Sequence, residues 1–117
     1  MDESIIYLKE KFSLPQVDIQ TYSPLTLAYI GDAAYELVVR TFLVDQGNSR
    51  PDKLHRKASS MVKAAAQAAM AEALKDSLTE EELSVYRRGR NAKSPTMAKN
   101  ASMSDYRKAT GFEALMG

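Results

Sequence analysis

The stretch of residues 27–35 constrains the fold most strongly, because the helix it predicts is apolar on nearly every side. A helix of this kind is usually buried at the centre of its domain. Ser23 and Pro24 fit its start, since serine caps helices and proline is tolerated in the first turn, where its missing N–H costs nothing. We expect this helix to reach about Asp45 and to end at 47–48.

Other parts of the chain also carry helical patterns, and no segment shows the alternation of apolar and polar residues typical of a strand. Thr79 and Ser102 are each followed three residues later by an acid, which fits a capping box. We therefore expect an all-α fold of about five helices in one domain, because 117 residues suffice for one modest core. The further expected helices are 3–12, one from Pro51 that is rich in alanine and methionine over 58–74, one from the Thr79 cap to about Arg88, and a last one after Ser102 that carries Phe112, Leu115 and Met116.

Composition excludes several kinds of site. The chain has no cysteine, which excludes disulfides, thiolate metal ligands and cysteine nucleophiles. A serine–histidine–acid triad would need the single histidine, His55, which lies in a basic stretch without a patterned acid. No glycine-rich phosphate loop is present. Carboxylates that bind hard divalent cations remain as the chemistry to consider.

The start of the chain and its apolar runs bear on location. Met1 is followed by two acids rather than by a basic stretch and an apolar run, which argues against a signal peptide. No apolar run approaches the length that a bilayer requires, so we expect no membrane association. The absence of disulfides fits a reducing compartment. We expect a cytoplasmic protein.

The net charge of +1 conceals two basic clusters. Residues 50–63 include five basic residues and a single acid, Asp52. An ordinary solvated surface and an anion-binding surface are equally favoured interpretations of this cluster. Residues 87–108 form a denser cluster, for which anion binding is favoured. Its bases are Arg87, Arg88, Arg90, Lys93, Lys99, Arg107 and Lys108, against Asp105 alone.

Two carboxylates stand out because their surroundings are apolar. Asp32 lies in the most apolar helix, and Glu113 lies within residues 111–116. An ionised carboxylate in such a setting costs several kcal/mol unless it is paired or bound to a metal. Each could instead be half exposed at a helix edge or paired with a lysine or arginine. Glu36, one turn after Asp32, could share its face or serve at the surface.

Three motifs in chain order resemble the ribonuclease III family. Residues 27–33, Leu-Ala-Tyr-Ile-Gly-Asp-Ala, resemble its signature helix. Residues 88–94, Arg-Gly-Arg-Asn-Ala-Lys-Ser, resemble the basic loop of its Mini-ribonuclease III branch, which lacks a separate double-stranded-RNA-binding domain. Residues 99–100, 106–107 and 112–117 continue the match. The resemblance implies one catalytic domain over 1–117, a ribonuclease III endonuclease-domain-like helical bundle.

The resemblance also implies an activity and a site. Members of this family are homodimeric, metal-dependent endoribonucleases that cleave double-stranded or structured RNA, including ribosomal RNA precursors, and leave a 5′-phosphate and a 3′-hydroxyl. Asp32 and Glu113 match the family's catalytic metal ligands, and Mg²⁺, with Mn²⁺ as a substitute, is the expected cofactor. A-form RNA is contacted mainly through phosphates and 2′-hydroxyls. The expected RNA-binding residues are Arg88, Arg90, Lys93, Lys99 and Arg107.

The sequence departs from the larger enzymes of the family in its acids. Those enzymes have acids at the positions of Leu25, Ala28 and Thr110, and the Mini branch has a hydroxyl residue at the last of these. One metal or two per site therefore stays open, with waters, phosphate oxygens or Thr110 completing the coordination. The chain stops at Gly117 within the pattern of the last helix, which fits either a short helix or a truncation.

Two other functions fit parts of the sequence. A catalytically inactive double-stranded-RNA-binding dimer would share the basic loop. A helical assembly protein would use the alanine- and methionine-rich helix as its contact face. The nuclease is favoured because it accounts for both the acids in apolar helices and the basic loop.

Overall fold

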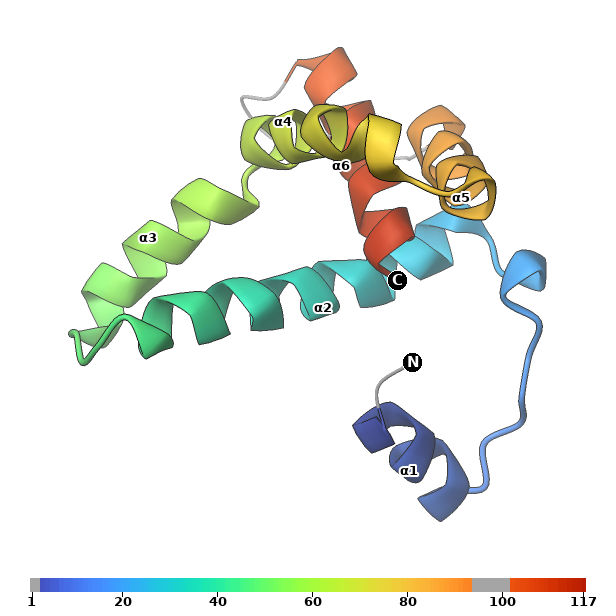
Figure 1. The fold of residues 1–117 in the computed structure, drawn as a ribbon, viewed down its shortest axis with the longest axis horizontal. Coiled ribbons are helices and arrows are strands. Elements are labelled where there is room, and N and C mark those ends of the chain that lie inside the picture. Colours follow the sequence, from blue (N-terminus) through green and yellow to red (C-terminus); the bar gives the residue numbers. More distant parts are fainter. Residues whose placement is uncertain (1–2, 94–101) are drawn as a thin grey trace.

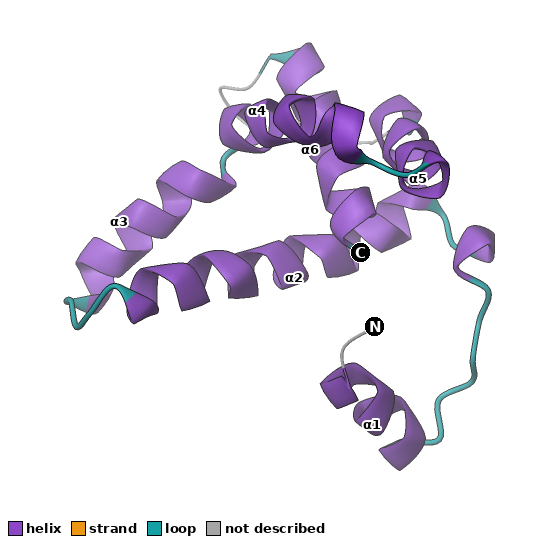
Figure 2. Cartoon of the chain, viewed as in Figure 1, coloured by secondary structure: helices purple, strands orange, loops and turns teal. Residues whose placement is uncertain are grey.

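The computed structural model describes residues 3–93 and 102–117, and within them all regular secondary structure is helical, without a strand (Figures 1 and 2). This confirms the expected all-α fold class. No helix of these residues has the length and apolar character needed to cross a membrane. The elements are α1 (Glu3–Lys11), the 3₁₀ helix η1 (Ile19–Thr21), α2 (Pro24–Asp45), α3 (Pro51–Val62), α4 (Ala64–Leu74), the 3₁₀ helix η2 (Lys75–Ser77), α5 (Glu80–Asn91) and α6 (Met103–Met116).

The predicted helix starts are confirmed by their capping hydrogen bonds. The Ser23 hydroxyl accepts from the Thr26 N–H at 3.1 Å, at the start of α2. Thr79 and Glu82 form the full capping box of α5, each side chain accepting from the other residue's backbone N–H. Ser102 caps α6 in the same way as Ser23 caps α2. Local sequence thus sets where these helices begin.

The expected single helix from Pro51 to Leu74 is wrong, because the backbone at Lys63 is extended and separates α3 from α4. The Gln67 side-chain amide donates to the Val62 carbonyl at 3.0 Å and so satisfies one of the carbonyls left open at the end of α3. No glycine or proline marks this break in the sequence.

The end of α5 also differs from the expectation. The helix continues to Asn91, so residues 89–91, expected to be loop, are helical. Gly89 is buried there, and a Cβ on it would lie 2.8 Å from Ala114 and from the Gly111 Cα of α6. Close packing on α6 therefore accounts for the longer helix. The rest of the expected basic loop, 94–101, lies outside the described residues.

Helix α6 is the centre of the core, with α2, α4 and α5 packed around it (Figure 1). Tyr35 of α2 meets Phe112 of α6 edge to face, with ring centroids 4.9 Å apart. The Tyr35 hydroxyl donates to the Met61 carbonyl at 3.0 Å, which connects α2 to the end of α3. The buried cluster consists of Tyr35, Val39, Leu43, Ala58, Ala71, Tyr86 and Phe112.

The expectation that residues 27–35 are buried on all sides is wrong in part. Leu27, Gly31 and Tyr35 face the core, but the side chain of Tyr29 is 83% exposed and that of Ile30 53%. The uncovered side continues along the rest of α2. A single chain thus covers one side of its most apolar helix and leaves the other in contact with water.

Candidate active site

The site is built where α2 crosses α6. A Cβ added at Gly31 would collide with the backbone carbonyl group of Glu113, so only glycine permits this approach of the two helices. Asp32 follows Gly31 directly on α2. The crossing therefore brings the carboxyl groups of Asp32 and Glu113 together from elements about 80 residues apart in the sequence.

The two carboxyl groups share a hydrogen bond. The pKa of Glu113 is raised to about 7, first because burial disfavours its charged form, then because of the negative charge of Asp32 and the hydrogen bond with it. Glu113 is partly buried and Asp32 is exposed. The sequence left open that each acid lies at a helix edge or is paired with a base. Asp32 does lie at an edge, and within the described residues neither acid forms an ion pair with a lysine or arginine.

This pair fits a hard divalent cation. Two carboxylates in contact repel each other when ionised, and a cation removes that repulsion while using both as oxygen ligands. In the described part of the chain, no histidine and no further acid lies close enough to join this pair as a third metal ligand. Glu36 forms an ion pair with Arg40 at 2.8 Å on the surface of α2. The buried Thr110 hydroxyl donates a hydrogen bond to the Tyr106 carbonyl at 3.0 Å.

The predicted RNA-binding residues have different surroundings. Lys93 and Arg107 are exposed. Arg90 is half-buried, and its guanidinium lies 5.9 Å from the centre of the Tyr86 ring. Arg88 donates to the Tyr22 carbonyl at 2.9 Å, so it also fixes the segment before α2. Lys99 lies outside the described residues.

Two lysines join this region that the sequence reasoning had not selected as RNA contacts. Lys108 forms an ion pair with Glu72 at 2.9 Å, and this hydrogen bond and charge lower the pKa of Glu72. Lys75 and Arg90 also act on the charge of Glu72 and thus lie near it. Lys108 was part of the basic cluster in the sequence, but Lys75 is outside it and only the fold brings it here.

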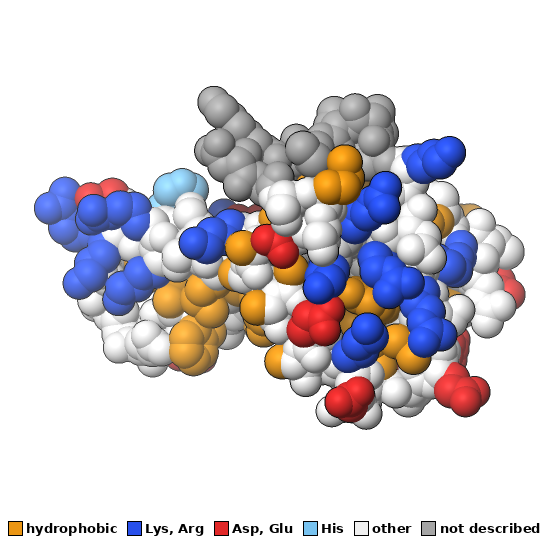
Figure 3. Space-filling view, turned by 90° about the horizontal axis from the view of Figure 1, so that it is seen from above, with side chains coloured by type: hydrophobic (Ala, Val, Ile, Leu, Met, Phe, Trp, Pro, Cys, Tyr) orange, Lys and Arg blue, Asp and Glu red, His pale blue; other side chains and the backbone are white. Residues whose placement is uncertain are grey.

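The other basic cluster, on α3, lies apart from these residues. Seen from above, lysine and arginine side chains gather at one end of the molecule over α3, and again at the other end over α4 and α5 (Figure 3).

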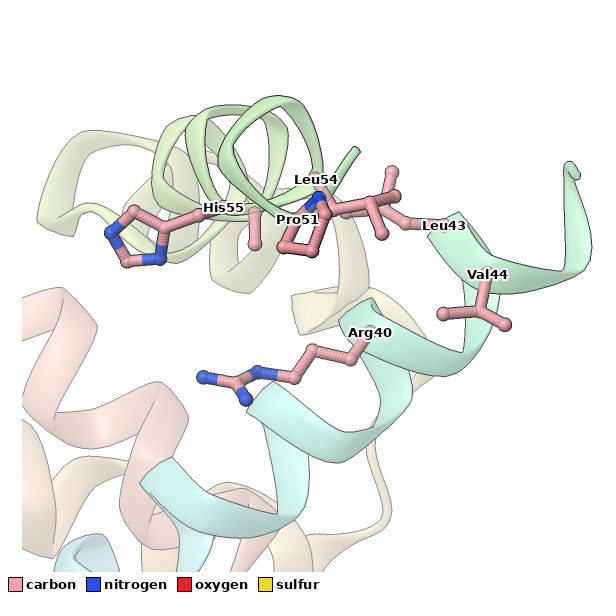
Figure 4. Close-up of a pocket in the computed structure, with 7 residues that line it drawn as sticks. Arg40, Leu43, Val44, Pro51, Leu54 and His55 are labelled. Carbon is pink, nitrogen blue, oxygen red and sulfur yellow. The ribbon is translucent and has the colours of Figure 1, made fainter. Parts of the chain in front are cut away.

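A groove of about 380 Å³ lies between the end of α2 and the start of α3, with Arg40 and His55 on its two sides (Figure 4). Its other lining residues are Leu43, Val44, Pro51, Leu54 and Ala58. Neither Asp32 nor Glu113 lines it, so it is separate from the carboxylate pair.

Known proteins resemble this chain over most of its length. The Ribonuclease III domain family matches residues 25–117. A Mini-ribonuclease 3 of Enterococcus faecalis is 52% identical over 86% of this chain and 77% of its own length. A Mini-ribonuclease 3 of Clostridium tetani is 46% identical over 95% and 73%, respectively. A crystal structure of a Fusobacterium nucleatum protein has a TM-score of 0.78 at 30% identity, covering 86% of this chain and 80% of that one.

Proposed function

Because the chain belongs to the ribonuclease III family, in its Mini-ribonuclease 3 branch, and is thus an endoribonuclease, we propose that it cleaves double-stranded RNA at the Asp32–Glu113 pair with the help of Mg²⁺ or Mn²⁺. The observation that carries this proposal is the contact between two carboxyl groups from distant helices, without a cation of the protein between them. We further propose that residues 1–117 act as a single catalytic domain.

Asp32 and Glu113 would hold the metal ion through their carboxylate oxygens. A bound Mg²⁺ lowers the pKa of a coordinated water and neutralises charge on a scissile phosphate, which supports hydrolysis to a 5′-phosphate and a 3′-hydroxyl. Glu113 must lose its proton to serve as a ligand, and its pKa of about 7 makes that loss easy at neutral pH. The Gly31 crossing keeps the two carboxyl groups together before any ion binds.

The basic residues at the end of α5 and on α6 would bind the RNA backbone. Arg90, Lys93 and Arg107 provide positive charge without a carboxylate at ion-pair distance among the described residues. Phosphate contacts of this kind suit an A-form duplex, whose deep major groove hides the base edges. Structured RNA, such as a ribosomal RNA precursor, is the substrate class that we propose, with the cytoplasm as the place of action.

A homodimer is the form in which we expect the enzyme to act. Ile30, Leu37 and Val44 are spaced by seven residues, so they follow one line along α2, and each is more than half exposed. An apolar line of this length is typical of a helix that packs against another helix. Two copies would give one carboxylate pair for each strand of a duplex.

The test compares two carboxylates on α2. Asp32→Asn removes a proposed metal ligand, whereas Glu36→Gln, one turn away, removes a carboxylate that is engaged with Arg40. With a long double-stranded RNA and Mg²⁺ on a denaturing gel, we expect Asp32→Asn to lose cleavage and Glu36→Gln to retain it. Excess chelator should abolish cleavage by Glu36→Gln and by the unaltered chain. Unchanged cleavage by Asp32→Asn would overturn the site. Intact RNA with the unaltered, dimeric chain would favour the inactive RNA-binding dimer.

A further inference from the structure

The N-terminal helix α1 is amphipathic, and it has no extensive packing contact with another helix among the described residues. Ile5, Leu8 and Phe12 follow one side of the helix at spacings of three and four residues, while Glu10 lies on the opposite side. All three apolar side chains are exposed, Phe12 by 68%, and no residue of α1 is buried. A nine-residue helix is marginal in water without a packing surface, so α1 needs another surface to bury this side.

The segment between α1 and α2 is fixed to the rest of the molecule near its end at α2. The Asp18 carboxylate accepts from the Gln20 N–H at 3.0 Å and caps η1. Arg88 of α5 donates to the Tyr22 carbonyl at 2.9 Å, and the backbone is extended at both Tyr22 and Ser23. These contacts anchor the base of the segment, so α1 is an arm that projects from the molecule.

The arm lies on the side of α2 that its own chain leaves uncovered. Figure 1 shows α1 on one side of α2, and α3, α4 and α5 on the other. Ile30, Leu37 and Val44 are 53%, 68% and 59% exposed within the chain, and Val44 also lines the groove beside the start of α3. A second α2 lying against this line would be on the same side of the molecule as α1.

The exposed area agrees with a large interface. The chain exposes 8595 Å², whereas a compact monomer of this length exposes about 6,300 Å². The excess, roughly 2,000 Å², is in the range that one subunit of an obligate homodimer buries. The radius of gyration is 15.3 Å, against about 13 Å for a compact chain of this length.

We propose that α1 is an exchanged arm, which packs its Ile5–Leu8–Phe12 side against α2 of a second copy of the chain. The proposal rests on the homodimer proposed above and adds that α1 contacts the partner and not its own α2. Each protomer would then hold the other's α2 between its own α2 and its own α1. Leu14, Val17 and Ile19, also exposed, would extend the contact toward the base of the arm.

The test uses introduced cysteines, since the chain has none of its own. One population carries Leu8→Cys, and a second, enlarged by a mass tag, carries Ile30→Cys, Leu37→Cys or Val44→Cys. After mixing and treatment with a short bis-maleimide, we expect a cross-link between the two populations for at least one α2 position. Glu10→Cys, on the opposite side of α1, is the control and should give much less product.

A chain with both cysteines distinguishes exchange from folding back. A linked monomer as its main product, without interchain product, would overturn the proposal, because α1 would then contact its own α2. A dimer in sedimentation with no link from α1 to α2 would also overturn the arm while leaving the dimer intact. RNA cleavage by the unaltered chain is scored separately, so loss of the proposed function is distinguishable from loss of the arm.

A second measurement does not depend on cysteines. The double substitution Leu8→Ser and Phe12→Ser should raise the dimer dissociation constant at least about tenfold, since burying apolar side chains contributes on this scale. Glu10→Ser should leave it within about twofold. An unchanged constant in the double variant would overturn the proposal.

Discussion

At the scale of single residues, the site depends on one position without a side chain. Gly31 lets the backbone of α2 approach that of α6 so closely that Asp32 and Glu113 share a hydrogen bond. The two acids were predicted from the sequence, because each lies among apolar residues and each matches a family motif. Their contact could not be predicted from spacing, since it depends on how two distant helices cross.

Gly31→Ala should destabilise the fold. A methyl group there meets backbone atoms of Glu113, which cannot move aside as a side chain can. We expect a loss of unfolding free energy on the order of 1–3 kcal/mol, even though alanine is a better helix former than glycine. Urea denaturation measures it. Ala33→Gly, at an exposed position of α2, should cost only the helix propensity of about 1 kcal/mol. A stabilised Gly31→Ala variant would contradict the close crossing.

The raised pKa of Glu113 makes the metal-free fold sensitive to pH. The folded value of about 7 lies above the 4.5 of an unperturbed glutamate, so the folded state binds the proton more tightly than the unfolded state. The contribution of Glu113 to stability therefore declines as pH rises from about 4.5 to 7 and is fully unfavourable above that window.

Glu113→Gln should remove this dependence. With chelator present, we expect urea denaturation to show that the variant is more stable, relative to the unaltered chain, at about pH 8 than at about pH 5. If the two proteins differ in unfolding free energy by the same amount at both pH values, the pKa of Glu113 is not raised in the folded chain.

At the scale of elements, the sequence predicted helix starts better than helix breaks. Serine and threonine caps act through bonds to backbone groups two or three residues away, so they are visible locally. At the break at Lys63, the buried Gln67 side chain donates a hydrogen bond to the Val62 carbonyl that the end of α3 leaves open. The extension of α5 to Asn91 depends on packing against α6. Neither has a local signal. The exposure of one side of α2 was missed for the same reason, since periodicity cannot say what covers an apolar surface.

The two basic clusters should contribute differently to RNA binding. In an Asp32→Asn background, which prevents cleavage, the pair Arg90→Gln and Lys93→Gln should reduce the magnitude of the slope of log affinity against log salt by about two. Lys53→Gln with Lys57→Gln on α3 removes the same charge and should leave the slope nearly unchanged. Filter binding to double-stranded RNA between about 50 and 200 mM KCl measures both. An effect of the α3 pair alone would move the RNA surface to α3.

At the scale of the whole molecule, activity should depend on the dimer. Leu37 is 68% exposed in the single chain, so Leu37→Glu should leave the monomer folded but place a charge in the proposed interface. We expect sedimentation to show a monomer, circular dichroism to show retained helix, and cleavage to fall at least about tenfold. Ala73→Glu adds the same charge at an exposed position of α4 and should change none of these. A fully active monomer would contradict the proposed dimer.

The central position of α6 has a consequence for synthesis of the protein. Helices α2, α4 and α5 leave the ribosome before the helix around which all three pack, so the core cannot close on the nascent chain until residues 103–116 emerge. Glu113 is among those residues, so Asp32 cannot form the carboxylate pair until they have emerged. A protein whose proposed substrate includes ribosomal RNA precursors thus acquires its cleavage site only after residues 103–116 have emerged, and a nascent chain without them carries no complete site.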